Sequence, residues 1–181
     1  KEVTDQQGIY TLLCARDGTP HKERLGANAL IGVSIAVAKT AAQTKGIPLY
    51  EYLKTLASIA PSRRVPLLYM NLLNGGKHAA NGLAFQEYHI VPDTEDVQEA
   101  IDIGLRIQER LTHICDQDLG VDKYSIGDEG GLAPQTHDVM KPLVYLTQAL
   151  QAEGLVGKVR LALDVAASSF FDTGAYIVAD E

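Results

Sequence analysis

The chain has no tryptophan and only two cysteines among its 181 residues. Cys14 and Cys115 lie far apart and belong to no CxxC pair or Cys/His cluster, which excludes a disulfide-stapled class and a zinc finger and predicts a reduced, cytoplasmic environment. No run of basic residues is present, and the net charge is −7. This balance excludes nucleic acid as the expected main partner, although metal ions could still make a site locally positive.

The chain also lacks a long hydrophobic run. Its longest apolar stretch, residues 25–38, is too short and too rich in small residues for a membrane span, and the opening KEVTDQQ has no apolar core of a signal peptide. Because 46% of the residues are hydrophobic and 22% are charged, the composition is that of an ordinary globular chain with material for a core. The length allows one domain, or one domain and a piece of another.

Helical spacing dominates the first third of the chain. Apolar residues recur at steps of three and four over residues 28–45, which predicts a buried helix, and residues 48–57 predict a second, short helix that begins at a proline. Residues 1–19 show no clear pattern, and residues 61–64 (PSRR) predict a linker.

Strands and helices alternate after this linker. The predicted elements are strands over residues 65–73, 83–92 and 159–171, and helices from Asp93 or Thr94 to about Leu119 and from Asp138 to Gly154. The first two strands are close in sequence, so they are expected to pair as an antiparallel hairpin. In the first of these helices the apolar stripe includes Val97, Ile101, Ile107 and Leu111.

Four stretches carry residues suited to chemistry. They are His78 in NGGKHAAN, Gln86 and Glu87 within an otherwise apolar strand, the loop 127–131 (GDEGG) and Asp164 near the end of the last strand. Each has an ordinary structural interpretation when taken alone: a loop histidine, an exposed strand face, a turn and a capping acid. Alternation within the last strand places Asp164 opposite its aliphatic row, as expected for a ligand delivered to the rim of a barrel.

Taken together, these stretches closely resemble the enolase family. The matching segments, which occur in the family's order, are LGANALIGVSIAVAK, GIPLYEYL, NLLNGGKHAAN, QEY, IGDEGGLAP and DVAASSFF. The resemblance implies an α/β fold of two parts. Residues 65–181 would be the first part of an enolase-type TIM barrel that opens with an antiparallel hairpin, and residues 1–60 the helical end of an α+β capping domain.

The resemblance also implies an activity and a set of roles. Enolases are homodimeric lyases of glycolysis that convert 2-phosphoglycerate to phosphoenolpyruvate with Mg²⁺. Glu129 matches the general acid, and Glu87 would lie beside it, where a second carboxylate helps it to keep its proton. His78 and Gln86 match substrate contacts, and Asp164 matches the first Mg²⁺ ligand.

Departures and omissions qualify this picture. Ser169 stands where the family commonly has Glu, while Lys77 and His89 occupy places expected to vary. The resemblance further implies a mobile N-terminal loop, two more acidic metal ligands, a general-base lysine and a second lysine and a histidine for substrate, none of which matches a residue of this chain. We therefore expect a partial enolase that is inactive alone.

Two alternatives stay open at this point. The first is an enolase-fold protein that has lost catalysis and serves as a binding or structural module. The second is another member of the superfamily that removes protons next to carboxylates, which the GDEGG and NGGKHAAN matches disfavour.

Overall fold

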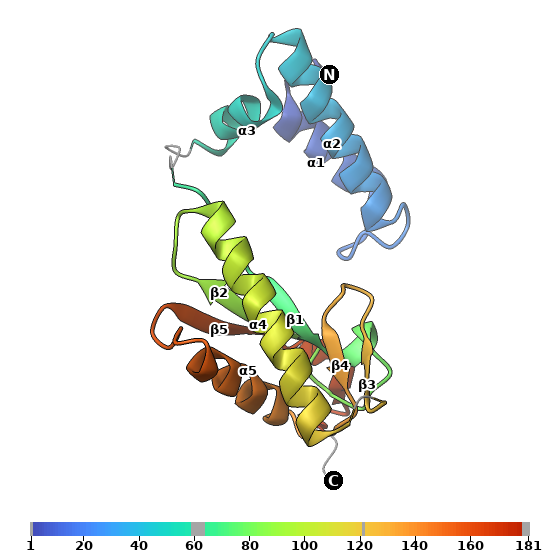
Figure 1. Cartoon of the computed structure of the whole chain (residues 1–181). Coiled ribbons are helices and arrows are strands. Elements are labelled where there is room, and N and C mark those ends of the chain that lie inside the picture. Colours follow the sequence, from blue (N-terminus) through green and yellow to red (C-terminus); the bar gives the residue numbers. More distant parts are fainter. Residues whose placement is uncertain (1, 59–63, 121, 179–181) are drawn as a thin grey trace. The chain divides into compact units, whose positions relative to one another are not determined.

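The chain divides into two compact units, residues 1–63 and 64–181. A computed structural model describes residues 2–58, 64–120 and 122–178 (Figure 1). The predicted linker at residues 61–64 therefore lies almost wholly outside the described residues. None of the described helices is both long and apolar enough to cross a membrane.

The described residues of the first unit form three helices. They are α1 (Gln6–Asp17), α2 (Ala27–Thr44) and α3 (Leu49–Ala57). The helices α2 and α3 confirm the two predicted from spacing, and they pack through a small core of Ala38, Ala41, Ala42 and Tyr52. Helix α1 was not predicted, because its apolar residues form no continuous stripe.

A buried carboxylate organises the connection between α1 and α2. Asp17 accepts hydrogen bonds from the backbone N–H groups of Thr19 (3.0 Å) and Leu25 (2.7 Å), and also from the Thr19 hydroxyl. The hydroxyl of Thr19, followed by the Leu25 N–H, holds the pKa of Asp17 below its ordinary value. This acid, only 1% exposed, therefore has a structural task, because it fixes both ends of the turn.

The second unit contains an open five-stranded sheet with order β3-β4-β1-β2-β5. Its strands are β1 (Met70–Asn74), β2 (Glu87–Pro92), β3 (Tyr124–Ile126), β4 (Leu132–Pro134) and β5 (Val159–Asp164). Its helices are α4 (Val97–Asp118) and α5 (Lys141–Ala152), with short 3₁₀ turns at Gly76–His78 and Ala167–Phe170. A separate two-stranded ribbon joins β6 (Phe171–Asp172) to β7 (Ala175–Tyr176).

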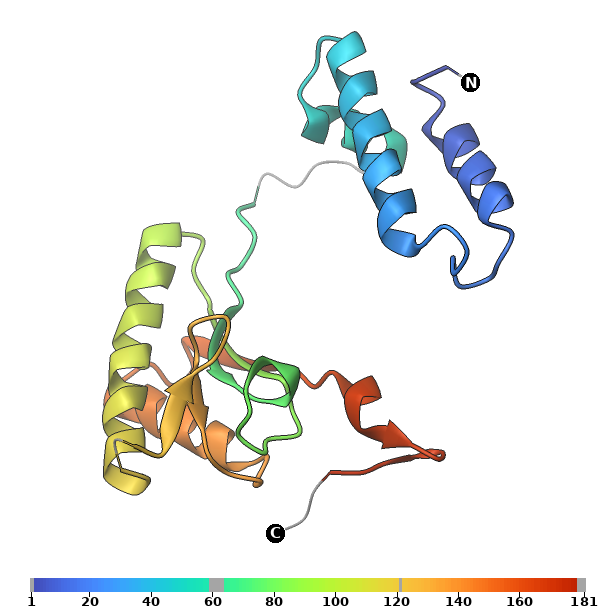
Figure 2. The same cartoon turned by 90° about the vertical axis from the view of Figure 1, so that its right-hand side faces the viewer.

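The predicted antiparallel hairpin of β1 and β2 is confirmed, while β4 runs parallel to β1. The described part of this sheet does not close, and β3 and β5 are its edge strands. Helices α4 and α5 pack against each other on one side of this sheet (Figure 2).

The core of the second unit lies between these helices and the sheet. Tyr88 and Ile90 of β2 point into it and are fully buried, whereas Glu87 and His89 alternate with them on the other face. Burial raises the pKa of Tyr88 far above its ordinary value, so the phenol stays neutral and donates to the Val139 carbonyl at 3.0 Å. The sheet thus has an apolar face under the helices and a polar face opposite.

Several predicted bounds were wrong. The first two strands begin five and four residues later than predicted, at Met70 and Glu87, and β5 ends at Asp164 instead of continuing to residue 171. Helix α4 is capped by the carboxylate of Asp96, which accepts from the N–H groups of Gln98 and Glu99, and not by Asp93 or Thr94. The hairpin of β3 and β4 was not predicted, since each strand has only three residues.

The stripe predicted for α4 was partly wrong. Ile107 and Leu111 are fully buried, but Val97 and Ile101 are 42% and 40% exposed. Ala100 and Ile103 are buried instead. The helix carries apolar residues over more than one stripe, and periodicity alone does not choose which stripe meets the sheet.

Candidate active site

Five strand ends meet at one edge of the sheet. Asn74 at the end of β1 is paired with Glu87 at the start of β2, and Glu87 is paired with Asp164 at the end of β5. The loop 127–131 joins β3 to β4 at this same edge, because Leu73 is aligned with Leu132. Segments far apart in the chain therefore bring their polar residues together there.

Three predicted residues form a cluster at this edge. The Nδ1 atom of His78 lies 3.4 Å from Oε1 of Glu87 and 3.5 Å from Oε2 of Glu129. The Glu87 and His78 side chains are 14% and 24% exposed, whereas Glu129 is 48% exposed. One carboxylate is thus sheltered and the other faces solvent. We call His78, Glu87, Glu129 and Asp164 the carboxylate rim.

Two further side chains contact this cluster. Nε2 of His89 lies 2.9 Å from Oε2 of Glu87, and Nδ2 of Asn71 donates to Oε2 of Glu129 at 2.9 Å. Neither was predicted as a site residue. The available sequence signal was the interruption of an apolar strand by Asn71 and the period-two spacing of Glu87 and His89.

The glycines of the loop 127–131 allow a close approach to the sheet. A Cβ on Gly127 would lie 2.8 Å from the Cβ of Asn74, and one on Gly131 would overlap the amide oxygen of Asn74. The Gly127 N–H donates to the Gly131 carbonyl at 2.8 Å, and Gly130 has a positive φ of 85°. Side chains at these places would push the loop, and with it Glu129, away from the rim.

The backbone of Asp128 ties this loop to the connection that carries His78. Its N–H donates to the His78 carbonyl at 3.3 Å, while its side chain is exposed. The contact fixes the loop next to the imidazole that reaches Glu87 and Glu129.

Gln86 lies immediately before β2, and its carbonyl accepts from the Gly75 N–H at 2.9 Å. Its side chain contacts the position where a Cβ on Gly76 would lie. A register shift in the β1–β2 pair falls between Asn71 and Leu73. Within a regular strand, adjacent residues point to opposite faces and could not both reach one site. Because Gln86 lies before the strand begins, Gln86 and Glu87 can both serve one site.

Asp164 ends β5 on the polar face, as alternation predicts, and its side chain is exposed. Its Oδ1 accepts from the Ala166 N–H at 2.9 Å, so it also caps the turn that follows. Mg²⁺ is commonly held through one or two carboxylates together with waters and substrate oxygens. An exposed carboxylate at a strand end fits one position of such a site.

The cluster of His78, Glu87 and Glu129 fits Mg²⁺ less well. Its ligand atoms lie within 4.8 Å of one another, which is close enough for a cation. One donor is an imidazole nitrogen, however, and Mg²⁺ prefers oxygen ligands. Both oxygens of Glu87 already face imidazole nitrogens. This arrangement suits proton transfer better than magnesium binding.

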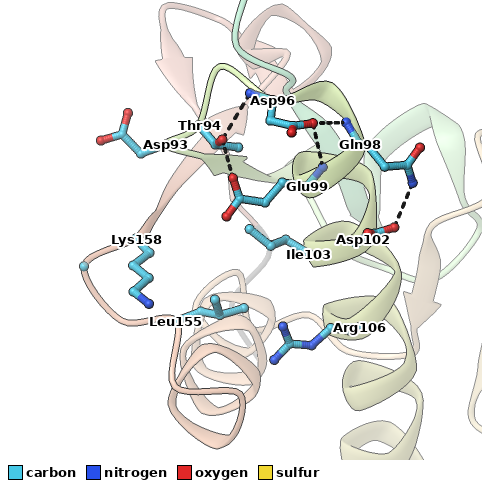
Figure 3. A pocket seen from close by; sticks show the side chains of 11 residues that line it. Asp93, Thr94, Asp96, Gln98, Glu99, Asp102, Ile103, Arg106, Leu155 and Lys158 are labelled. Atoms are coloured by element: carbon cyan, nitrogen blue, oxygen red, sulfur yellow. Dashed lines mark hydrogen bonds between the residues drawn. The ribbon is translucent and has the colours of Figure 1, made fainter.

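A pocket of about 690 Å³ lies at the opposite end of β2 and β5 (Figure 3). Its lining includes Asp93, Asp96, Glu99 and Lys158. The acids there are engaged locally: Asp96 caps α4, and the Thr94 hydroxyl donates to Glu99 at 2.5 Å. We call it the α4 pocket. Its acids make structural contacts, and none of the predicted site residues lines it.

Comparison with known families agrees with this arrangement. A model of the enolase C-terminal TIM barrel domain matches residues 62–181, and a model of the enolase N-terminal domain matches residues 1–53. The two matches cover nearly the whole chain in the order expected of the family. The open α/β sheet of the second unit is consistent with a partial barrel. The chain belongs to the enolase family.

Proposed function

We propose that the protein is an enolase, a lyase that reversibly dehydrates 2-phosphoglycerate to phosphoenolpyruvate with Mg²⁺. The observation that carries this proposal is the convergence of His78, Glu87 and Glu129 at the strand ends, with ligand atoms within 4.8 Å. Membership of the family supports an enolase-type function in general. The residues at the rim support the specific reaction, because they are an acid, a second carboxylate and an imidazole in one place.

Glu129 acts in this proposal as the general acid. Hydroxide is a poor leaving group, so a positioned carboxyl must protonate it as the carbon–oxygen bond breaks. Glu129 is half exposed and can reach a substrate, while the sheltered Glu87 lies 3.4 Å from the same His78 Nδ1 atom. Glu87 would stabilise the proton on the rim between turnovers.

In this proposal His78, Gln86 and Asp164 bind and orient the substrate. His78 and Gln86 would hydrogen-bond to it from the connection between β1 and β2. Asp164 would supply one ligand to Mg²⁺, which when bound neutralises charge that develops on the substrate carboxylate. By family resemblance, we expect a cytoplasmic homodimer.

A direct assay tests this function. The enzyme that contains this chain is mixed with 2-phosphoglycerate and Mg²⁺, and phosphoenolpyruvate is followed by its ultraviolet absorbance. We expect turnover that a chelator abolishes and Mg²⁺ restores. A folded protein that binds 2-phosphoglycerate without turnover would instead support the non-catalytic binding module.

The 181 residues alone should not turn the substrate over. The family resemblance implies a general-base lysine and further metal acids, and none of them matches a position of this chain. Turnover by the isolated chain at the rate of the complete enzyme would contradict the proposed division of roles.

A further inference from the structure

A cross-strand pair on the polar face has no role in the proposed function so far. Asn71 of β1 and His89 of β2 are direct partners in the antiparallel register. Each reaches one carboxylate of the rim: His89 Nε2 lies 2.9 Å from Glu87 Oε2, and Asn71 Nδ2 donates to Glu129 Oε2 at 2.9 Å. The two carboxylates are thus contacted by two side chains that are neighbours on adjacent strands.

The contact of His89 with Glu87 is well shielded. Their side chains are 13% and 14% exposed, so water competes little for this contact. The ring of His89 also meets Tyr69 edge-on, with centroids 6.2 Å apart and planes at 76°, which restricts its rotation. A restrained donor restricts in turn the rotamer of the flexible Glu87 side chain.

The tautomer of His89 follows from its surroundings. An ionised carboxylate only accepts hydrogen bonds, so Nε2 must carry the proton that Glu87 receives. The Nδ1 atom is buried, and no partner for it is found among residues 2–58, 64–120 and 122–178. A proton on Nδ1 would bury an unpaired donor, whereas a bare Nδ1 is a less costly acceptor. The geometry therefore places a proton on Nε2, where it faces Glu87.

We propose that His89, with its partner Asn71, is a positioning residue of the rim. His89 would hold Glu87, and Asn71 would hold Glu129, so that both carboxylates stay against Nδ1 of His78. Neither residue would touch the substrate, because each acts through the carboxylate that it binds. This inference rests on the proposed function, in which the two carboxylates handle the proton of the reaction.

Substitutions at His89 separate positioning from packing. Hydrogen bonds to charged groups are strong enough that His89→Leu should lower kcat by about 10- to 100-fold, with KM changed less than about 3-fold. His89→Gln offers a donor near the place of Nε2 and should keep kcat within about 3-fold of the parent enzyme. His113→Leu, at an exposed histidine on α4, is the matched control and should leave kcat unchanged.

A double-mutant cycle tests whether His89 acts through Glu87. In a Glu87→Ala background, His89→Leu should have little further effect on kcat, because the group it positions is gone. Thermal unfolding of each variant checks that the fold persists. Equal losses in His89→Gln and His89→Leu, or an undiminished loss in the Glu87→Ala background, would overturn the proposal.

A measurement without turnover keeps this inference separate from the proposed function. Nitrogen-15 NMR of the substrate-free enzyme should show His89 with a protonated Nε2 and a bare Nδ1, and Glu87→Ala should alter the Nε2 signal. A protonated Nδ1 with a bare Nε2 would contradict the positioning role even in an active enzyme. Failure to convert 2-phosphoglycerate would remove the proposed reaction while the NMR result still decides the contact.

Discussion

The two ends of strands β2 and β5 use carboxylates in different ways. Around the α4 pocket, Asp96 accepts from N–H groups of the helix that follows it, and Glu99 accepts from nearby Thr94. At the carboxylate rim, Glu129 is bound by Asn71, which is 58 residues away in sequence. The first kind of contact forms with a local helix start, whereas the second requires the folded sheet.

This difference shows why size is a poor guide to the site. The α4 pocket is large, at about 690 Å³, yet its acids Asp96 and Glu99 are satisfied by residues at the start of α4. At the rim, Glu87 and Glu129 instead both lie beside the imidazole of His78. Opposed titratable groups are a feature of catalytic sites, and capping acids are a feature of helix ends.

The largest expected effect comes from exchanging one acid at each end. Glu129→Gln keeps the size of the side chain and its contact with Asn71 but removes its ability to donate a proton. We expect turnover of 2-phosphoglycerate by the complete enzyme to fall by about 10²- to 10⁴-fold, the usual contribution of a positioned acid. Steady-state kinetics and a substrate-binding measurement check this, since binding should survive.

Glu99→Gln at the α4 pocket is the matched control. It removes a charge from the first turn of α4, where an acid contributes only about 0.3–1 kcal/mol to stability, and turnover should not change. Similar losses of turnover in both variants would show that the two ends do not differ as we infer, and near-normal turnover in Glu129→Gln would refute the role of that acid.

The next effect concerns magnesium. Asp164→Asn replaces a carboxylate by a neutral amide, which is a poorer ligand for Mg²⁺. The Mg²⁺ concentration for half-maximal turnover should rise by about 10-fold or more, the loss typical even of residues that only support a metal ligand. Magnesium titration of the complete enzyme measures the change, and activity should partly return at high Mg²⁺.

Asp93→Asn is the matched control for this magnesium titration. Asp93 is an exposed acid at the other end of the strands, where it pairs with Arg160 at 3.1 Å. Its substitution should leave the magnesium titration unchanged. An unchanged titration in Asp164→Asn as well would mean that Asp164 serves only the turn that it caps.

A smaller effect is expected from the close packing of the loop 127–131 against Asn74. In Gly131→Ala the new methyl group would overlap the Asn74 amide oxygen and come within 3.0 Å of the Leu72 carbonyl carbon. Overpacking of this kind costs about 1–3 kcal/mol, so the free energy of unfolding should fall. Chemical denaturation of the second unit, followed by circular dichroism, measures this loss.

Gly32→Ala provides the opposite case. Nothing lies within 4 Å of a Cβ at Gly32 in the middle of α2, and alanine is favoured over glycine in a helix by about 0.5–1 kcal/mol. This variant should be at least as stable as the parent chain. Equal destabilisation by both changes would argue against a specific contact between the loop and Asn74.

Elements with strong local patterns could be predicted from the sequence. The helices α2 and α3 have regular spacing, and the family motifs pointed to His78, Glu87 and Glu129, which the structure brings together. Their catalytic roles stay predictions. The three-residue strands β3 and β4 give too short a pattern to recognise, because alternation over three residues occurs in many loops.

The holding residues of the rim could not be predicted, for a different reason. Asn71 contacts Glu129, which is 58 positions away in the sequence. His89 becomes a candidate only because the sheltered side chain of Glu87 lies beside it. Both contacts depend on strand register, because a shift of one residue would turn these side chains to the opposite face of the sheet. The family motifs therefore pointed to the candidate site residues, whereas the residues that contact them became visible only in the folded sheet.

The smallest effect tests the structural acids near the α4 pocket. Glu153, at the end of α5, accepts from Arg106 (2.8 Å) and Arg110 (2.8 Å) of α4, and these hydrogen bonds, that of Arg106 first, hold its pKa below the ordinary value. A lowered pKa in the folded state stabilises the fold above the ordinary carboxyl range and loses this effect as the pH falls through the lowered value. Glu153→Gln should therefore lower the melting temperature slightly at pH 7. The difference in melting temperature between this variant and the parent chain should narrow as the pH falls through the acidic range. Glu109→Gln, at an exposed acid on α4, serves as the charge control. Melting curves recorded from pH 7 to about pH 3, below the ordinary carboxyl range, test this. A difference that is absent at pH 7 or independent of pH would show that the ion pairs between α4 and α5 do not stabilise this end of the unit.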